Sequence, residues 1–429
     1  MKLERIYNDV VKETLYSGQH ESGLCVYVMP KEGYSKSYAI FGTHFGSVDR
    51  KFITPGQTGF TEIPDGVAHF LEHKMFEQPD GGNVFESYAR HGANANAYTS
   101  FNLTAYLFES TQDILENLGI LLDFVRQPYF TDENVAKEQG IIGQEIGMYD
   151  DDPDWRVMMN FLSSMYDVHP VRRDIAGTVE SISEITKDTL YQCYNTFYNL
   201  SNMVLFVVGD VQPEAVAECV EQHIKETKPF DEEIVRDYGK EPENVLRPEI
   251  SQQLSVSVPM FMFGFKDVDC GYDGKALLKK NLELSILAEI LFGKSGDLYT
   301  KLYDGGYILG DLGVEVDCEK DYGFTVLSGE SKKPQEVKRI VLEYLAEAVS
   351  HGISADDFER VKRSVWGRYI KQFNNINALA HGFMSNIFNR IGIFDFTDVI
   401  GTVTLEDVNK RLVKQFVPEL SVLSVVEPV

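Results

Sequence analysis

The sequence of 429 residues has few cysteines, few basic residues relative to acidic ones, and no long apolar run. No segment approaches the roughly 18 consecutive apolar residues of a membrane-spanning helix, and segment 1–9 is charged and lacks the apolar core of a signal peptide. We therefore expect a cytoplasmic protein that does not contact a membrane. The five cysteines lack C-x-x-C spacing and the even count of a disulfide framework, so we expect reduced thiols: Cys25, Cys193, Cys219, Cys270 and Cys318.

Basic residues are outnumbered, because the chain has 40 Lys and Arg against 66 Asp and Glu, a formal net charge of −26. The phosphates of nucleic acids attract a basic surface, so this balance argues against a nucleic-acid partner. A strongly acidic surface favours basic or neutral partners, and cationic peptides are one such class. The same charge can equally do no more than keep the protein soluble.

The most informative segment is 66–76, Gly-Val-Ala-His-Phe-Leu-Glu-His-Lys-Met-Phe. On a helix, His69 and His73 are four residues apart and project from one face, and Glu72 stays near that face. Two such imidazoles can share one ion, and His-x-x-Glu-His on a helix is the mirror-order motif of zinc peptidases. Zinc held by two histidines and a carboxylate keeps one position open for water and lowers the pKa of that water, so Glu72 is a candidate proton acceptor. The alternative is a half-buried helix that carries two histidines and binds no metal.

A third metal ligand is expected in segment 134–148, where apolar residues recur with helical periodicity after the helix-start signal Thr131-Asp132. Glu138 and Glu145 are seven residues apart, and two turns of helix bring them to nearly the same face. One carboxylate could bind the metal while the other orients a ligand from behind. Alternatively, the pair belongs to a solvated helix face.

The His-x-x-Glu-His helix followed by Glu-x6-Glu resembles the pitrilysin/insulinase family of zinc peptidases, the inverzincins, in the bacterial two-domain form that is similar to the subunits of mitochondrial processing peptidase. Further segments resemble signatures of this family, and together they span essentially the whole chain: 42–49, 92–99, 169–170 and 202–210. The resemblance implies a zinc endopeptidase with one Zn²⁺ per chain, bound by His69, His73 and Glu145. It also implies that Glu72 is the general base and that Glu138 supports the ligands from behind.

In this family the substrate lies extended against an edge strand. The resemblance of 92–99 to that strand implies that a peptide pairs with the main chain of Asn94, Ala95, Asn96, Ala97 and Tyr98. Main-chain pairing does not depend on side-chain identity, so selectivity is expected from side-chain pockets and from the size of the chamber. The expected substrates are peptides and unfolded segments.

The order of predicted elements in 1–225 recurs in 250–429, and the charged, proline-containing segment 226–249 is predicted to be a linker. The duplication predicts two similar α+β domains. Alignment of the copies places other residues at the motif positions and near the position of Glu145: Ser285, Ala288, Glu289 and Arg368. The N-terminal domain is therefore expected to be catalytic. The resemblance implies that the degenerate C-terminal domain completes half of a clamshell chamber.

The chain departs from the family in its second half. Family members hold substrate there with an Arg and a Tyr, and the corresponding positions of this chain are Asp297 and Leu309, with Tyr307 nearby. A carboxylate cannot replace a guanidinium that donates to backbone carbonyls. We therefore expect the catalytic subunit of a heterodimer whose homologous partner supplies the Arg/Tyr pair, and a homodimer stays open. A catalytically silent scaffold subunit and an accessory factor in elongation factor P modification are further functions that the sequence allows.

Overall fold

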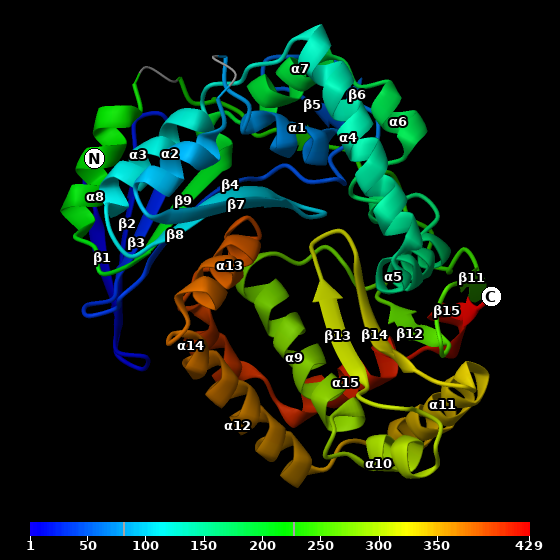
Figure 1. The fold of residues 1–429 in the computed structure, drawn as a ribbon. Helices are drawn as coiled ribbons and strands as arrows, with labels where there is room; N and C mark the ends of the chain where they lie inside the picture. Colours follow the sequence, from blue (N-terminus) through cyan, green and yellow to red (C-terminus); the bar gives the residue numbers. More distant parts are fainter. Residues whose placement is uncertain (80–81, 226–227) are drawn as a thin grey trace. The chain divides into compact units, whose positions relative to one another are not determined.

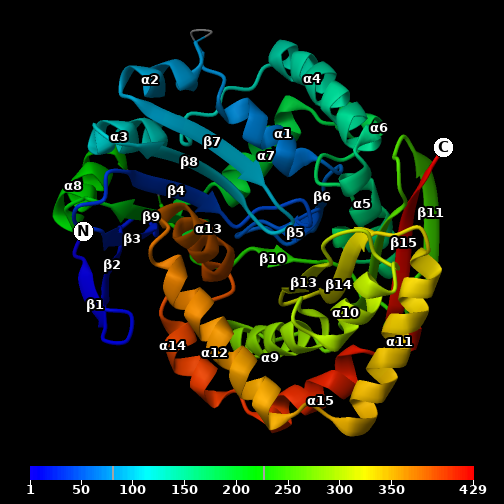
Figure 2. The same ribbon diagram turned by 60° about the horizontal axis from the view of Figure 1, so that its bottom comes forward.

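The structure of the protein is a computed structural model that describes residues 1–79, 82–225 and 228–429. Helices and strands are mixed along the chain (Figures 1 and 2), and the predicted α+β class is confirmed. The contacts between residues divide the chain into two compact units. Unit 1 consists of Met1–Ile146, Asp174–Tyr238 and Lys371–Phe388, and unit 2 consists of Gly147–Arg173, Gly239–Ile370 and Asn389–Val429.

Unit 1 is built on a seven-stranded sheet with the order β1-β2-β3-β9-β4-β8-β7. β3 and β9 pair in parallel, and the other neighbours pair antiparallel. Every residue of β4 and β9 is buried, as expected for central strands covered on both faces. The strands are β1 (Glu4–Asn8), β2 (Glu13–Gln19), β3 (Cys25–Pro30), β4 (Ser37–Thr43), β7 (Ala93–Thr99), β8 (Thr104–Ser110) and β9 (Met203–Gly209).

Helices cover both faces of this sheet. α1 (Val67–Met75) and α2 (Val84–Arg90) pack against β7, and α3 (Ile114–Phe124) packs against β8 and β4. α13 (Ile376–Ile387) packs against β4 and β9, on the face opposite to α1, α2 and α3 in both views (Figures 1 and 2). The remaining elements of unit 1 are the start of α4 (Asp132–Asp151), α6 (Val179–Ser183), α7 (Lys187–Phe197), α8 (Pro213–His223), and the small sheet of β5 (Lys51–Ile53), β6 (Thr61–Glu62) and β10 (Val235–Arg236).

Unit 2 is built on a five-stranded sheet with the order β11-β15-β12-β14-β13, in which only β11 and β15 pair in parallel. α5 (Pro153–Met165) packs against β11, β12 and β15, whereas α9 (Gly274–Phe292) packs against β13. The strands are β11 (Glu249–Leu254), β12 (Met260–Lys266), β13 (Gly313–Cys318), β14 (Gly323–Glu330) and β15 (Ser421–Pro428). The other helices are α10 (Asp297–Asp304), α11 (Pro334–His351), α12 (Ala355–Gln372), α14 (Asp395–Val399) and α15 (Leu405–Gln415).

Each unit contains a helix from the other half of the sequence. α5 belongs to the first half but packs in unit 2, where Phe161 contacts the ring of Phe324 at 5.7 Å between centroids. α13 belongs to the second half but packs in unit 1, where Phe383 lies 4.5 Å from Phe206. The two units therefore differ from the predicted limits 1–225 and 250–429.

The predicted linker 226–249 is partly structured. Val235 and Arg236 form β10 and pair antiparallel with β5, and the Arg236 Nε donates to Asp49 Oδ1 at 2.9 Å. The first two residues of the predicted linker, 226 and 227, lie outside the described residues.

Candidate metal centre

Helix α1 carries the His-x-x-Glu-His motif. It begins after Gly66, which has a left-handed φ of 90°, and a Cβ atom at this position would lie 2.4 Å from the carbonyl oxygen of Ala176. Both the dihedral angle and the close approach require glycine. One helical turn separates His69 from His73, and their ring centroids lie 4.6 Å apart. The two imidazoles thus lie side by side, as the spacing predicts.

Helix α4 supplies the third group of the site. At its start the Asn134 N–H donates to Thr131 Oγ1 (3.1 Å) and the Thr131 N–H donates to Asn134 Oδ1 (2.8 Å), a reciprocal arrangement like a capping box. Further along the helix, Glu145 Oε1 lies 3.7 Å from His69 Nε2, and Glu145 Oε2 lies 3.5 Å from His73 Nε2. One ligand atom of each of the three residues lies within 4.8 Å of the others. The structure therefore brings together the three side chains that the resemblance implies as ligands.

The space between these three groups suits a zinc ion. In a tetrahedral site with metal–ligand distances of about 2.0–2.1 Å, ligand atoms lie roughly 3.3–3.4 Å apart. The distances of 3.7 and 3.5 Å run from the two imidazoles to different oxygens of the Glu145 carboxylate; both are near this spacing and longer than hydrogen bonds. Two imidazoles and one carboxylate are also a ligand set of catalytic zinc sites. Within the described part of the chain, no other group of His, Cys, Asp and Glu side chains comes together in this way.

Burial and neighbouring charges set the protonation of the two histidines. Burial, with a smaller effect from the charge of His73, lowers the pKa of His69 to about 4. For His73, burial lowers the pKa, but the hydrogen bond with Glu138 and the charges of Glu72 and Glu145 outweigh burial and leave the pKa raised. Since a ligating imidazole must be neutral, His69 is already in the required form, whereas a metal ion competes with a proton at His73.

Glu138 lies behind His73. Its Oε1 is 3.1 Å from His73 Nδ1, and its Oε2 is 3.5 Å from the Nζ of Lys74. An Nδ1–H that donates to Glu138 leaves the lone pair of Nε2 directed toward Glu145. Burial raises the pKa of Glu138, but the hydrogen bond with His73 and the charge of Lys74 lower it by more. The carboxylate is therefore ionised and holds the imidazole in one orientation.

Lys74 is a part of the site that the motif alone does not indicate. Its side chain is fully buried and pairs with Glu77 as well as with Glu138. Because a buried ammonium group needs such partners, Lys74 ties α1 to α4 behind the histidines. The available signal is a lysine between His73 and Met75 with an acidic residue three positions further on, at Glu77.

Glu72 contacts the end of β7. The Thr99 Oγ1 donates to Glu72 Oε2 at 2.8 Å. Burial raises the pKa of Glu72, and the hydrogen bond from Thr99 offsets part of that rise. Thr99 is predicted at the end of the edge strand, but this contact is not, because it exists only where α1 packs against β7.

The predicted peptide-binding residues all lie in β7, the outermost strand of the sheet of unit 1: Asn94, Ala95, Asn96, Ala97 and Tyr98. The side chains of Asn94 and Asn96 are exposed, whereas the Tyr98 ring packs against His381 of α13 at 5.2 Å between centroids. The Ala97 N–H donates to Asn96 Oδ1 (2.9 Å). A side chain thus satisfies this main-chain donor of the edge strand.

In unit 2 an ion pair lies at positions that correspond to the motif. The Arg368 Nη2 of α12 lies 3.5 Å from Glu289 Oε2 of α9. These residues align with Glu145 and His73 of the first half. A guanidinium in place of a carboxylate offers donors only, so it pairs with Glu289 and cannot bind a cation.

Family models match both halves of the sequence. Residues 59–179 match the model described as insulinase (peptidase family M16), and residues 184–365 match the model described as peptidase M16 inactive domain. The chain belongs to the M16 peptidase family. The second model begins within the first half, at residue 184, and covers the part of the second half up to residue 365, which lacks the His-x-x-Glu-His motif.

Individual M16 relatives agree with this assignment. A Bacillus subtilis (strain 168) protein named uncharacterized zinc protease YmfH is 43% identical over 427 residues, 99% of each chain. The crystal structure of a protein described as an M16-like peptidase from Alicyclobacillus acidocaldarius has a TM-score of 0.92 at 36% identity, over 100% of this chain and 99% of that one. The fold is also similar to that of pitrilysin, with a TM-score of 0.74 at 15% identity over 99% of this chain and 46% of that one. The predicted relation to the pitrilysin/insulinase zinc peptidases is confirmed.

None of the helices formed by the described residues is both long enough and apolar enough to cross a bilayer.

Proposed function

We propose that this M16 protein is a cytoplasmic, zinc-dependent endopeptidase that hydrolyses peptides or unfolded segments, with one zinc ion per chain held by His69, His73 and Glu145. The observation that carries the proposal is the convergence of these three side chains at distances that suit a tetrahedral ion. The name zinc protease, which the B. subtilis relative carries, supports it.

A zinc ion held in this site would act as a Lewis acid: it would polarise the scissile carbonyl and lower the pKa of water. Glu72 takes a proton from the attacking water and passes it to the leaving amine. Its raised pKa, caused mainly by burial, suits a group that must both accept and return a proton near neutral pH. Thr99 orients the Glu72 carboxylate, and Glu138 orients His73.

The substrate lies extended along β7 in this proposal. β7 is an edge strand, so its outer main-chain groups can pair with a peptide by β-augmentation. The Asn96 side chain must then release the Ala97 N–H to a peptide carbonyl. The exposed side chains of Asn94 and Asn96 remain available to contact the peptide, whereas the Tyr98 ring packs against His381.

The catalytic chain works with a homologous partner subunit in this proposal. Asp297 is the first residue of α10, and the side chain of Leu309 is 45% exposed. Neither side chain can donate hydrogen bonds to a peptide backbone as an arginine or a tyrosine does. A heterodimer in which the other chain supplies these donors accounts for the departure, and a homodimer is the alternative arrangement.

Metal analysis and one isosteric substitution test the proposed function. The purified protein is expected to contain about one zinc per chain by mass spectrometry of the metal, and to cleave a quenched fluorescent peptide when its partner is present. Glu72→Gln keeps the shape of the side chain but removes the base, so zinc content should persist while cleavage falls by at least about 100-fold. A variant with full activity would exclude Glu72 as the base.

A catalytically silent scaffold subunit is the second candidate, and the lack of the Arg/Tyr pair in unit 2 favours it. A scaffold does not need the metal, so the same measurement separates the two functions. A protein that takes up no zinc after dialysis against the metal would contradict the peptidase and support the scaffold.

A further inference from the structure

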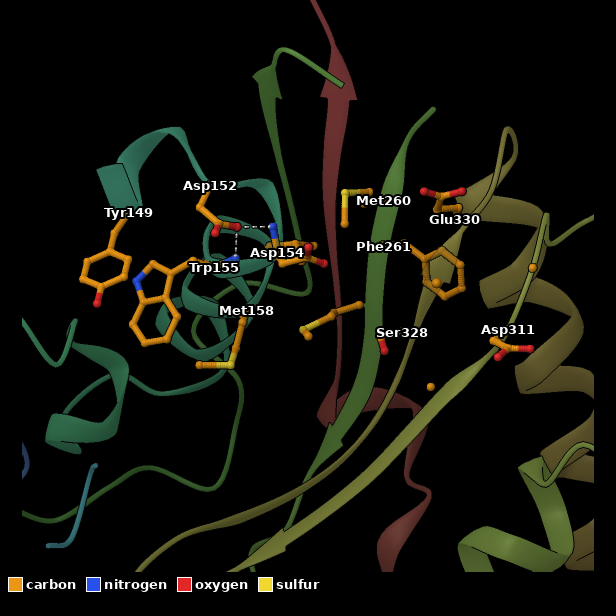
Figure 3. A pocket seen from close by; sticks show the side chains of 15 residues that line it. Tyr149, Asp152, Asp154, Trp155, Met158, Met260, Phe261, Asp311, Ser328 and Glu330 are labelled. Atoms are coloured by element: carbon orange, nitrogen blue, oxygen red, sulfur yellow. Dashed lines mark hydrogen bonds between the residues drawn. The ribbon is translucent and has the colours of Figure 1, made fainter. Parts of the chain in front are cut away.

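Unit 2 contains a cavity of about 620 Å³ to which the proposed function assigns no role. Tyr149, the start of α5, and strands β12 and β14 line it, together with the segment that leads into β13 (Figure 3). Its volume lies within the range of ligand-binding pockets, roughly 300–1,000 Å³. The cavity is therefore large enough for at least one long side chain of a ligand.

The wall of the cavity is aromatic and rich in methionine. The rings of Tyr149 and Trp155 lie 5.2 Å apart at an interplanar angle of 32° and form one side (Figure 3). Met158, Met260 and Met262 add flexible thioether side chains. Such a surface binds the methylene chain of an amphipathic side chain, and aromatic faces attract a cation.

The rim of the cavity is acidic. Its carboxylates are Asp152, Asp154, Asp311 and Glu330, and none of the described residues that line it is Lys, Arg or His. Asp152 accepts from the N–H groups of Asp154 and Trp155 at 2.9 and 3.1 Å, so it is tied to the start of α5. Asp311 pairs with Lys294 at 2.7 Å, whereas Asp154 and Glu330 are exposed. The cavity thus combines an apolar wall with negative charge, which matches a lysine or arginine side chain.

An edge strand of the sheet of unit 2 adjoins the cavity. β13 is the outermost strand of the sheet of unit 2. Its first residue, Gly313, pairs with Ser328 of β14, and both residues line the cavity. Side chains alternate along a strand, so Glu315 and Asp317 point to the same face as Gly313. An extended peptide that pairs with this edge presents every second side chain to that face.

We propose that this cavity and the adjoining edge of β13, together called the acidic cavity site, bind an extended peptide segment with lysine or arginine at alternate positions. The inference rests on the proposed peptidase function in so far as it names basic peptides as the substrate class.

Tryptophan fluorescence tests the site directly, because the chain has just two tryptophans. In the full-length double variant Trp366→Phe and Glu72→Gln, Trp155 is the sole tryptophan and cleavage of the probe is suppressed. The probes are an acetylated and amidated octapeptide of alternating lysine and threonine, and its counterpart of alternating glutamate and threonine. The lysine peptide is expected to shift the Trp155 emission. By calorimetry it should bind at least 10-fold more tightly than the glutamate peptide, and its affinity should fall as salt is added.

Two matched sets of neutral substitutions locate the binding. Asp154→Asn, Asp311→Asn and Glu330→Gln together remove three charges of the acidic cavity site and should weaken binding of the lysine peptide at least 10-fold. The control set removes three exposed charges elsewhere in unit 2 and should change binding less than 2-fold: Asp356→Asn, Glu359→Gln and Glu419→Gln. Equal affinity for the two peptides, or equal losses in the two sets, would overturn the proposal.

Three further outcomes separate this proposal from others. If spermidine binds as tightly as the lysine peptide and displaces it, the site accepts polyamines and the peptide proposal fails. If the chain binds no zinc and cleaves nothing but still binds the lysine peptide through Trp155, the acidic cavity site stands and the peptidase proposal falls. If the wild-type chain cleaves peptides while Trp155 does not respond, the acidic cavity site falls alone.

Discussion

Glu138 and Glu145 of α4 lie beside different nitrogens of one imidazole. Glu138 lies 3.1 Å from His73 Nδ1, a hydrogen-bond distance, whereas Glu145 lies 3.5 Å from Nε2 and also approaches His69. The helical spacing of seven residues predicts that both carboxylates share a face, and the structure shows that they do. The contacts of Thr99 with Glu72 and of Lys74 with Glu138 could not be predicted, because each depends on how α1 packs against an element distant in the sequence.

Neutralising Glu138 tests its support of His73. Glu138→Gln keeps the size of the side chain but weakens the hold on the Nδ1–H, and loss of such a partner lowers metal affinity by about 10- to 100-fold. Competition with a chelator of known zinc affinity measures the change. Glu133→Gln, an exposed position of the same helix, is the matched control and should leave zinc affinity unaltered. Unchanged affinity in both variants would mean that Glu138 does not orient His73.

Removing the hydroxyl of Thr99 tests the orientation of Glu72. Thr99→Val preserves the shape of the β-branched side chain but loses a hydrogen bond to a carboxylate, an interaction of about 1.5–3 kcal/mol. We expect kcat to fall roughly 10- to 100-fold with zinc content and KM nearly constant. Thr99→Ser retains the donor and should recover most of the rate. A Thr99→Val enzyme with normal kcat would remove this residue from the site.

The helices and strands were easier to predict than the sheets against which the helices pack. Short apolar runs such as 203–208 and 420–426 are typical of buried strands, and both lie in the interiors of their sheets as β9 and β15. The duplication also predicted the common order of helices and strands. Hydrophobic periodicity shows that a helix has an apolar face but not which sheet that face covers. For that reason the exchange of α5 and α13 between the halves was missed.

The role of α13 in unit 1 can be tested with one substitution. Phe383 is 3% exposed and contacts Phe206 and Tyr27, so Phe383→Ala should lower the free energy of unfolding of unit 1 by about 3–5 kcal/mol. The exchange rates of the β4 and β9 amide hydrogens measure this loss of stability. Ser385→Ala, at an exposed position of the same helix, serves as the control. Faster exchange confined to unit 2 would contradict the packing described for α13.

For the whole molecule, the missing donors of unit 2 lead to the prediction of a partner. An arginine and a tyrosine that hold the peptide backbone are together worth about 3 kcal/mol, or roughly 100-fold in kcat/KM. Adding a purified homologous subunit that carries both residues should therefore raise cleavage of a quenched peptide by at least that factor. Replacing that arginine with alanine in the added subunit should cancel the gain. An isolated chain that is already fully active would show that no partner is needed.

The placement of α13 also determines when unit 1 can be completed during synthesis. The sheet of unit 1 ends at Gly209, yet the helix that covers β4 and β9 ends at Ile387. Until the ribosome has translated that far, the nascent sheet exposes Tyr27 and Phe206 to solvent, and exposed apolar surfaces of this kind make a folding intermediate prone to aggregate. A gene truncated between the two halves would therefore yield an unfinished and aggregation-prone product, not an autonomous catalytic fragment.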